Sequence, residues 1–167
     1  MGFNLIISTS IEFARLICKL YFKRNILGKF LTYSVFKKEI QSDPNLLPEL
    51  DQYIIDIAKN AGLDNDKLND LSLSFSEALS NSITHGNKNN ISKKIRIEVL
   101  IDENKMTILI KDEGNGFDLK KIPDPTKPEN ILKDSGRGIH IMKSFLDNLS
   151  YNFTSEGTET ILVINLK

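Results

Sequence analysis

The spacing of hydrophobic residues divides the chain into helical and extended segments. Residues 33–41 are typical of a first strand. Asp43-Pro44 is a helix-start signal, with the aspartate as N-cap and the proline in the first turn, and this helix is expected to end at Gly62. Residues 63–65 are expected to cap a second helix, which ends at His85-Gly86. Apolar residues recur every three or four positions in both helices, so each should bury one face.

After Gly86 the hydrophobic period changes from 3.6 to 2, which predicts strands. The elements expected from here on are a hairpin over residues 95–101 and 106–111, a Gly- and Pro-rich loop over 113–128, a helix over 138–148 and a closing strand pair over 150–155 and 159–166. This order predicts an α/β (α+β) fold, a two-layer sandwich with helices on one face of a mixed sheet.

Composition narrows the classes of protein that the chain can belong to. Its 167 residues favour a single domain, and 22 Lys and Arg against 22 Asp and Glu argue against direct nucleic-acid binding through a global basic field. A content of 40% hydrophobic and 26% charged residues excludes wholesale disorder. The single Cys18 forms no intrachain disulfide, so we expect a reducing, cytoplasmic location. We expect neither a transmembrane segment nor a signal peptide.

The zero net charge hides a division of the chain. Residues 1–38 contain seven Lys and Arg and one Glu, so they carry +6 and the remainder carries −6. Within them, residues 10–31 have the pattern of a basic amphipathic helix. A membrane-surface or partner-binding arm is one interpretation. A helix packed on the domain edge, or an upstream extension from an early start codon, is favoured over it.

Two polar clusters interrupt the pattern that builds the core. Glu77 and Asn81 are four residues apart, so both project from one helix face. A carboxylate beside an amide oxygen suits Mg²⁺ when phosphates supply the other ligands, although for this pair taken alone an exposed polar stripe is the favoured interpretation. Asp112 ends an apolar strand, and Gly114 and Gly116 follow it. The glycines let a ligand approach the backbone, and the aspartate could accept a hydrogen bond from an exocyclic amine; a plain turn is the alternative.

Two further clusters contain glycine. Gly136-Arg137-Gly138 opens the predicted helix over 138–148, where free N–H groups and the helix dipole form an anion site. Arg137 could add a contact to a terminal phosphate. Gly157-Thr158 precedes the last strand. Taken alone, each of these clusters is also compatible with an ordinary loop.

In order and spacing, the four clusters resemble the ATP-binding boxes of the Bergerat-fold superfamily, which includes gyrase, heat-shock chaperones, histidine kinases and mismatch-repair ATPases. Within it the sequence is most similar to the bacterial anti-sigma-factor serine kinases. The local matches are SEALSNSITHG, IKDEGNGFD, IPDPTKPENILKDSGRGIHIMKSFLD and GTETILVINL. The resemblance covers about residues 35–167, so we expect an ATP-binding kinase domain there and an extension over residues 1–34.

The resemblance implies a role for each matching residue. Asn81 would hold the Mg²⁺ that bridges the ATP phosphates, and Glu77 would be the catalytic base for an incoming serine. Asp112 would bind the adenine amino group, with Gly114, Gly116 and Thr158 completing that end of the site. Residues 119–135 would form a lid, and Gly136, Arg137 and Gly138 would meet the phosphates. Phosphoryl transfer needs mainly positioning and charge neutralisation, which such groups can supply.

The resemblance also implies partners and leaves alternatives. It implies a homodimer that binds a sigma factor and phosphorylates a serine on a STAS-domain antagonist. A non-catalytic ATP-sensing module is the first alternative, against which the carboxylate of Glu77 argues. The catalytic half of a histidine kinase or chaperone ATPase is a weaker one, since no two-helix dimerisation domain precedes the boxes. His85 and His140 are not assigned a catalytic role.

Overall fold

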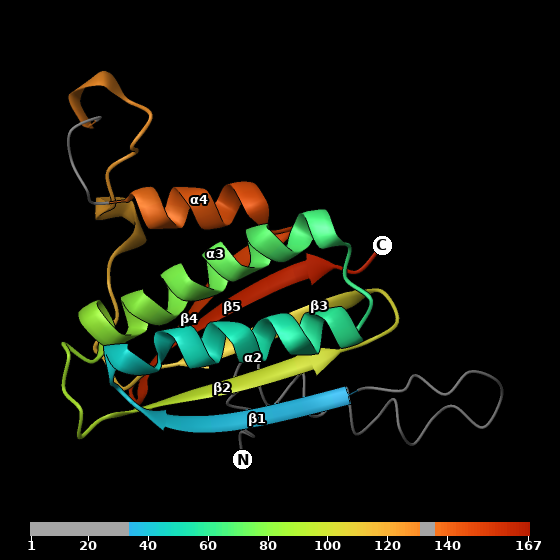
Figure 1. Ribbon diagram of the computed structural model, residues 1–167. Coiled ribbons are helices and arrows are strands. Elements are labelled where there is room, and N and C mark those ends of the chain that lie inside the picture. Colours follow the sequence, from blue (N-terminus) through green and yellow to red (C-terminus); the bar gives the residue numbers. More distant parts are fainter. Residues whose placement is uncertain (1–33, 131–135) are drawn as a thin grey trace, which may run out of the picture. The chain divides into compact units, whose positions relative to one another are not determined.

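The computed structural model describes residues 34–130 and 136–167 (Figure 1). The predicted basic arm over residues 10–31 and Cys18 lie outside the described residues, as does part of the predicted lid, residues 131–135. The elements, in chain order, are β1 (Ser34–Gln41), a 3₁₀ turn (Pro44–Leu46), α2 (Leu47–Asn60), α3 (Asn65–Asn81), a π-helical turn (Ser82–Gly86), β2 (Lys94–Ile101), β3 (Lys105–Lys111), two 3₁₀ turns (Leu119–Lys121 and Pro128–Asn130), α4 (Arg137–Phe145), β4 (Asn148–Thr154) and β5 (Gly157–Asn165).

The five strands form one sheet in the order β1-β2-β3-β5-β4, with the helices on one face (Figure 1). The two-layer α+β sandwich is confirmed. The expected mixed sheet is wrong, because all four strand pairings are antiparallel. Two helices separate β1 from β2, so the chain enters β2 in the opposite direction. A single helix separates β3 from β4, which therefore run the same way, but β5 lies between them.

Strand register divides the helix-facing side of the sheet into rows of different chemistry. One row across the sheet contains Val99, Ile108 and Leu162, all buried. The next row contains Ile110 and Thr160. Because side chains alternate between the two faces of a strand, polar Thr160 faces the helices together with the apolar residues of its strand. The core is therefore apolar under one part of the helical layer and polar at the end nearest Asp112.

The helices begin largely where the sequence predicts, but the second helix ends differently. Asp43 caps the 3₁₀ turn that precedes α2, its Oδ1 accepting a hydrogen bond from the N–H of Asn45 at 2.9 Å, and α2 itself begins at Leu47 without a side-chain cap. Asp64 precedes α3 without a side-chain capping bond. Regular α-helix stops at Asn81, and a π-helical turn follows, closed by the N–H of Asn87 donating to the carbonyl of Ser82 at 2.8 Å. The wider turn places the chain after α3 against the loop that follows β3.

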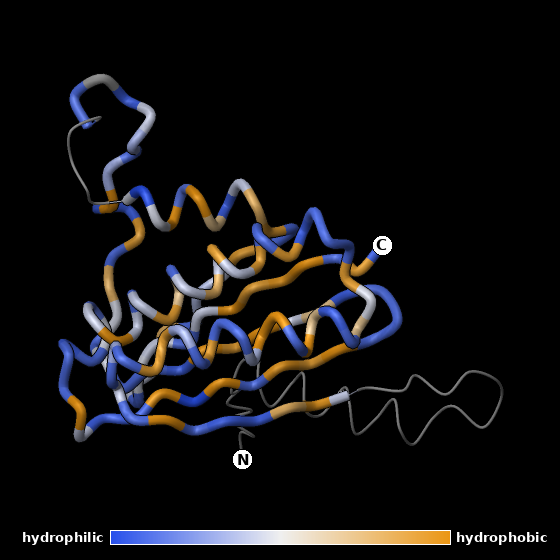
Figure 2. Tube along the Cα trace, viewed as in Figure 1, coloured by the Kyte–Doolittle hydropathy of each residue, from blue (hydrophilic) through white to orange (hydrophobic). Residues whose placement is uncertain are grey.

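The hydrophobic core lies between the sheet and its helical layer. α3 packs against both α2 and α4 and is the central helix of that layer. In Figure 2, hydrophobic colours dominate the central strand β5, whereas the edge strand β1 and the outer part of the loop between β3 and α4 are largely hydrophilic. Within the ranges that the structure describes, no helix combines the length and hydrophobicity needed to cross a membrane. The largest side chains that are fully buried are Phe75, Leu50, Ile54, Leu71, Leu79, Ile83, Ile95, Ile97, Met106, Ile108, Ile110 and Met142.

Two leucines of α3 test which face of this helix the core depends on. Leu71 is 0% exposed and Leu73 is 53% exposed. We expect Leu71→Ala to lower the free energy of unfolding by about 2–5 kcal/mol, because it leaves a cavity, and Leu73→Ala to change it by less than about 0.5 kcal/mol. Urea unfolding followed by circular dichroism measures both. Equal losses would contradict the packing described for α3.

Candidate functional site

A cleft of about 660 Å³ opens between α3, the start of α4 and the ends of β4 and β5. Its volume lies within the range of about 300–1,000 Å³ that is common for small-molecule sites. Predicted site residues from all four polar clusters line it: Glu77, Asn81, Asp112, Gly116, Gly136, Gly138 and Thr158. Segments that are far apart in the sequence therefore meet around one cavity.

Asp112 lies at the inner end of the cleft and is 3% exposed. Its Oδ1 accepts hydrogen bonds from the N–H of Gly114 at 2.8 Å and of Thr158 at 3.4 Å. Its own N–H donates to the carbonyl of Thr158 at 2.9 Å. Burial raises the pKa of Asp112 above its ordinary value, and the hydrogen bonds from Gly114 and Thr158 partly oppose that rise. A buried carboxylate held in this way can accept a hydrogen bond from a ligand but leaves no room for a bulky group beside it.

The close approach of three chain segments fixes the position of this carboxylate. A Cβ atom on Gly86 would lie 2.5 Å from Cγ of Asp112, so only glycine permits the contact. A Cβ atom on Gly114 would in turn lie 2.5 Å from the carbonyl oxygen of Gly86. Gly114 itself does not line the cleft; its contribution is the N–H that holds Asp112.

The outer end of the cleft is formed where α3 meets the beginning of α4. Glu77 and Asn81 are one helical turn apart and partly buried, and both line the cleft. A Cβ atom on Gly138 would overlap Oε2 of Glu77 and lie 3.8 Å from Nδ2 of Asn81. The carboxylate of Glu77 therefore lies against the backbone of the first turn of α4.

The start of α4 has the form expected of an anion site. Gly136 is the N-cap in a left-handed conformation, with φ of 90°, and no side chain caps the helix. The first N–H groups of a helix have no intrahelical acceptor, and the dipole favours negative charge there. These groups and the amide of Asn81 form the end of the cleft suited to phosphates.

The structure does not place every predicted residue in this cleft. Arg137 is exposed and lines a separate shallow hollow of about 380 Å³, together with Thr126 and His140. Its predicted phosphate contact stays a prediction. His85, which was assigned no catalytic role, lines the main cleft and is exposed.

Sequence reasoning missed the aromatic wall of the cleft. Phe117 packs edge-on against Tyr151 and Phe153, with ring centroids 5.1 and 5.3 Å apart. Phe117 and Tyr151 line the cleft. Burial raises the pKa of Tyr151 to about 12, further above neutral pH than its ordinary value. Thr160, also missed, is buried and lines the cleft. One signal was available: Thr158 and Thr160 are in phase with Leu162 and Ile164 and so share the core-facing side.

This arrangement fits a nucleotide with a bound cation. The inner end offers a buried hydrogen-bond acceptor between uncharged walls, and the outer end offers backbone N–H groups, a carboxylate and an amide. Within residues 34–130 and 136–167, no three His, Cys, Asp or Glu side chains gather as a metal site. A cation would therefore need ligands from phosphates, as Mg²⁺ in nucleotide sites commonly has. The fold and the cleft together define the class of protein: an α+β domain with a cleft suited to a nucleotide.

Comparison with known proteins identifies the family. Residues 40–164 match the family described as the histidine kinase-like ATPase domain. An anti-sigma F factor of Clostridium beijerinckii is 37% identical over 106 residues, which cover 61% of this chain and 72% of that protein. The serine-protein kinase RsbW of Oceanobacillus iheyensis is 26% identical over 126 residues, 72% of this chain and 80% of that protein. The anti-sigma F factor of Bacillus subtilis is 37% identical over 100 residues, which cover 58% of this chain and 67% of that protein.

The chain therefore belongs to the histidine kinase-like ATPase domain family, and its resemblance to the anti-sigma-factor kinases of this family is confirmed. Membership implies the use of ATP. Among solved structures, the histidine kinase domain of a blue-light activated histidine kinase from Erythrobacter litoralis aligns with a TM-score of 0.49 and 16% identity, over 88% of this chain and 74% of that one.

Asp112→Asn tests the inner end of the cleft. An amide oxygen can still accept from Gly114 and Thr158, so the fold should persist, and loss of a buried charge should leave stability at pH 7 equal or higher. The NH₂ group of the new amide would face the adenine amino group, so that two donors meet without an acceptor, at a cost of about 1–3 kcal/mol in binding free energy. We expect isothermal titration with ATP to show affinity reduced at least about fivefold. Undiminished affinity would remove Asp112 from the site.

The raised pKa of Asp112 gives binding a definite pH dependence. Because the pKa of Asp112 is higher in the folded than in the unfolded protein, protonation of this carboxyl stabilises the fold. This contribution to the free energy of unfolding is complete below the unfolded-state pKa and is lost as pH rises through the folded-state pKa. The ionised carboxylate is a stronger acceptor for a ligand amino group than the protonated carboxyl, so ATP affinity should fall as pH decreases through that folded-state pKa. Calorimetric titrations at several pH values should show that the ATP affinity of the wild type begins to decline at a pH above the ordinary pKa range of aspartate. The same decline should be absent in Asp112→Asn.

Proposed function

We propose that the protein is an ATP-dependent serine/threonine protein kinase that acts as an anti-sigma regulatory factor in the cytoplasm. It would bind a sigma factor, phosphorylate a serine of a STAS-domain antagonist and form a homodimer. The names of its relatives support the sigma-factor partner and the kinase activity. The observation that carries the proposal is the carboxylate of Glu77, which lies against the first turn of α4 in the cleft that also contains Asn81 and Asp112.

Each end of the cleft would have a separate task. Bound ATP with Mg²⁺ would supply the phosphoryl group. Asp112 would accept a hydrogen bond from the adenine amino group and so fix the base, with Gly116 and Thr158 closing the pocket around it. Asn81 would hold the metal ion through its amide oxygen. The N–H groups at the start of α4, after Gly136 and at Gly138, would orient the phosphates.

Glu77 would act on the second substrate. A serine hydroxyl that enters the outer end of the cleft would donate a hydrogen bond to the carboxylate. The carboxylate would take up the proton as the serine oxygen attacks the γ-phosphorus of ATP, and the bond from that phosphorus to the β–γ bridging oxygen would break to release ADP. Positioning and charge neutralisation provide most of the catalysis in phosphoryl transfer, so a single base in a rigid helix is sufficient. A cleft that only senses ATP has no evident need for this carboxylate.

Glu77→Gln separates catalysis from binding. The substitution keeps size and removes the proton acceptor, so we expect phosphate transfer to fall by about 10²-fold or more, with ATP affinity within about threefold of wild type. The assay uses radiolabelled ATP, Mg²⁺ and a panel of STAS-domain proteins. Glu103→Gln, in the exposed turn between β2 and β3, is the matched control and should behave as wild type.

The outcomes of this assay distinguish the candidate functions. Transfer that depends on Glu77 supports the kinase. Transfer at the wild-type rate by Glu77→Gln would remove Glu77 as the base. ATP binding with no transfer to any partner by the wild type would favour the non-catalytic ATP-sensing module instead.

A further inference from the structure

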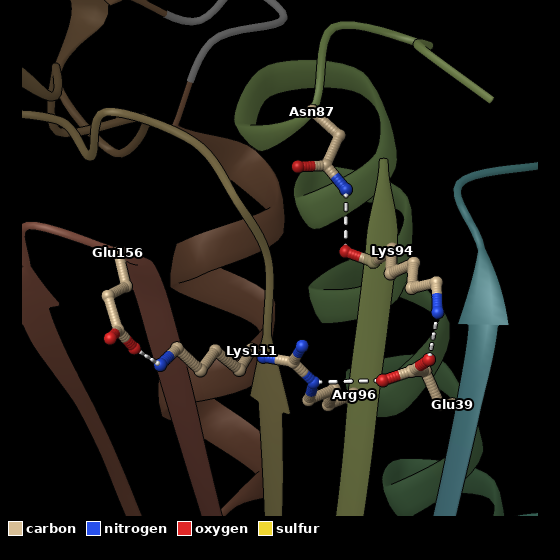
Figure 3. Close-up of polar contacts among 6 residues, drawn as sticks. All are labelled: Glu39, Asn87, Lys94, Arg96, Lys111 and Glu156. Atoms are coloured by element: carbon tan, nitrogen blue, oxygen red, sulfur yellow. Dashed lines mark hydrogen bonds and ion pairs between the residues drawn. The ribbon is translucent and has the colours of Figure 1, made fainter. Parts of the chain in front are cut away.

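Asn87 follows the π-helical turn directly and is buried, with 1% of its surface exposed. The sequence pattern shows only a polar loop here, yet the side chain makes two hydrogen bonds to backbone groups. Its Nδ2 donates to the carbonyl of Lys94 at 3.1 Å, at the start of β2 (Figure 3). Its Oδ1 accepts from the N–H of Glu113 at 2.8 Å. The side-chain amide of Asn87 thus connects the start of β2 to the loop that follows β3.

Glu113 is the residue after Asp112, and both of its backbone groups are held by side chains. Asn87 holds the N–H, and Nζ of Lys93 donates to the carbonyl at 2.7 Å. On its other side, Asp112 is bonded to Thr158 of β5 through its own N–H. The peptide that presents the Asp112 carboxylate is therefore tied to the start of β2 and to β5 at once.

Asn87 is itself held rigidly. Its N–H closes the π-helical turn by donating to Ser82, and the preceding Gly86 lies against the carboxylate of Asp112. A displacement of Asn87 would therefore move a direct neighbour of that carboxylate as well as the loop that bears it. Binding that depends on one exact hydrogen bond is sensitive to shifts of about 1 Å.

We propose that Asn87 is a positioning residue, which holds the Asp112 carboxylate in line with the amino group of a bound adenine and so sets the preference of the cleft for 6-aminopurines. This inference rests on the proposed ATP site. It places the control of base selectivity outside the cleft lining, since Asn87 lines no part of the cavity. Contacts to phosphates at the outer end should not depend on it.

The test compares two nucleotides in two variants. ATP and purine riboside triphosphate, which lacks the 6-amino group, are titrated calorimetrically into wild type, Asn87→Ala and Asn90→Ala. Asn90 lies in the same loop, and its Oδ1 accepts from the N–H of Ser92 without contacting Glu113, so it is the matched control. We expect Asn87→Ala to lower ATP affinity at least about fivefold and to leave the analogue within about twofold. Asn90→Ala should retain the wild-type ratio.

If the role of Asn87 is merely structural, Asn87→Ala should lower the affinities for both nucleotides equally, and that result would overturn the inference. An unchanged ratio in folded Asn87→Ala would do the same, as would a wild type with no preference between the two nucleotides. A wild type that binds neither nucleotide would overturn the proposed ATP site and this inference together. A wild type without preference would also remove the proposed role of Asp112, whereas the two results for Asn87→Ala leave the ATP site intact.

If circular dichroism shows that Asn87→Ala is unfolded, the same titrations with Lys93→Met test the inference instead. It removes the second tie to Glu113 and retains most of the side-chain length. Measured at pH 8.5, well above the range in which carboxyl groups titrate, it should lower the ratio of ATP to analogue affinity in the same direction. A wild-type ratio in Lys93→Met would then overturn the inference.

Discussion

The arrangement of the cleft depends on the burial of one carboxylate at a point where three chain segments meet. Asp112 is held by N–H groups from its own loop and from β5, and Gly86 lies directly against it. Burying a charge is costly unless hydrogen bonds compensate for it. Those contacts require β3, β5 and the turn after α3 to be correctly assembled, so the site exists only when these elements have come together.

The division of the cleft into two ends follows from the same assembly. Strand alternation brings Thr158 and Thr160 to the helix-facing side, where they replace apolar residues beneath the helical layer. α3 extends from this polar end to α4, where its residue Glu77 lies against Gly138. The π-helical turn that follows α3 then places Gly86 against Asp112, so one continuous stretch of chain connects the two ends of the cleft.

Much of the fold could be predicted because it follows from local physics. Helix periodicity located α2, and alternation located the strands, whereas the predicted Asp43 cap belongs to the 3₁₀ turn that precedes α2. The mixed sheet was wrong because sequence order does not reveal that β5 lies between β3 and β4. The π-helical turn was missed since its residues continue a helical pattern, and the turn ends at Gly86, which lies against Asp112, a residue distant in sequence.

The sequence by itself determined which residue types stand at the candidate site: the pair Glu77 and Asn81 on one helix face, the aspartate with its glycines, and the glycines before α4. Only the tertiary structure decided how they meet. It directed Arg137 to a neighbouring hollow and brought Asn87 into contact with the loop of Asp112. The physical reason is that periodicity specifies which face of an element is buried, whereas contacts between elements depend on strand order and on close approach at single residues.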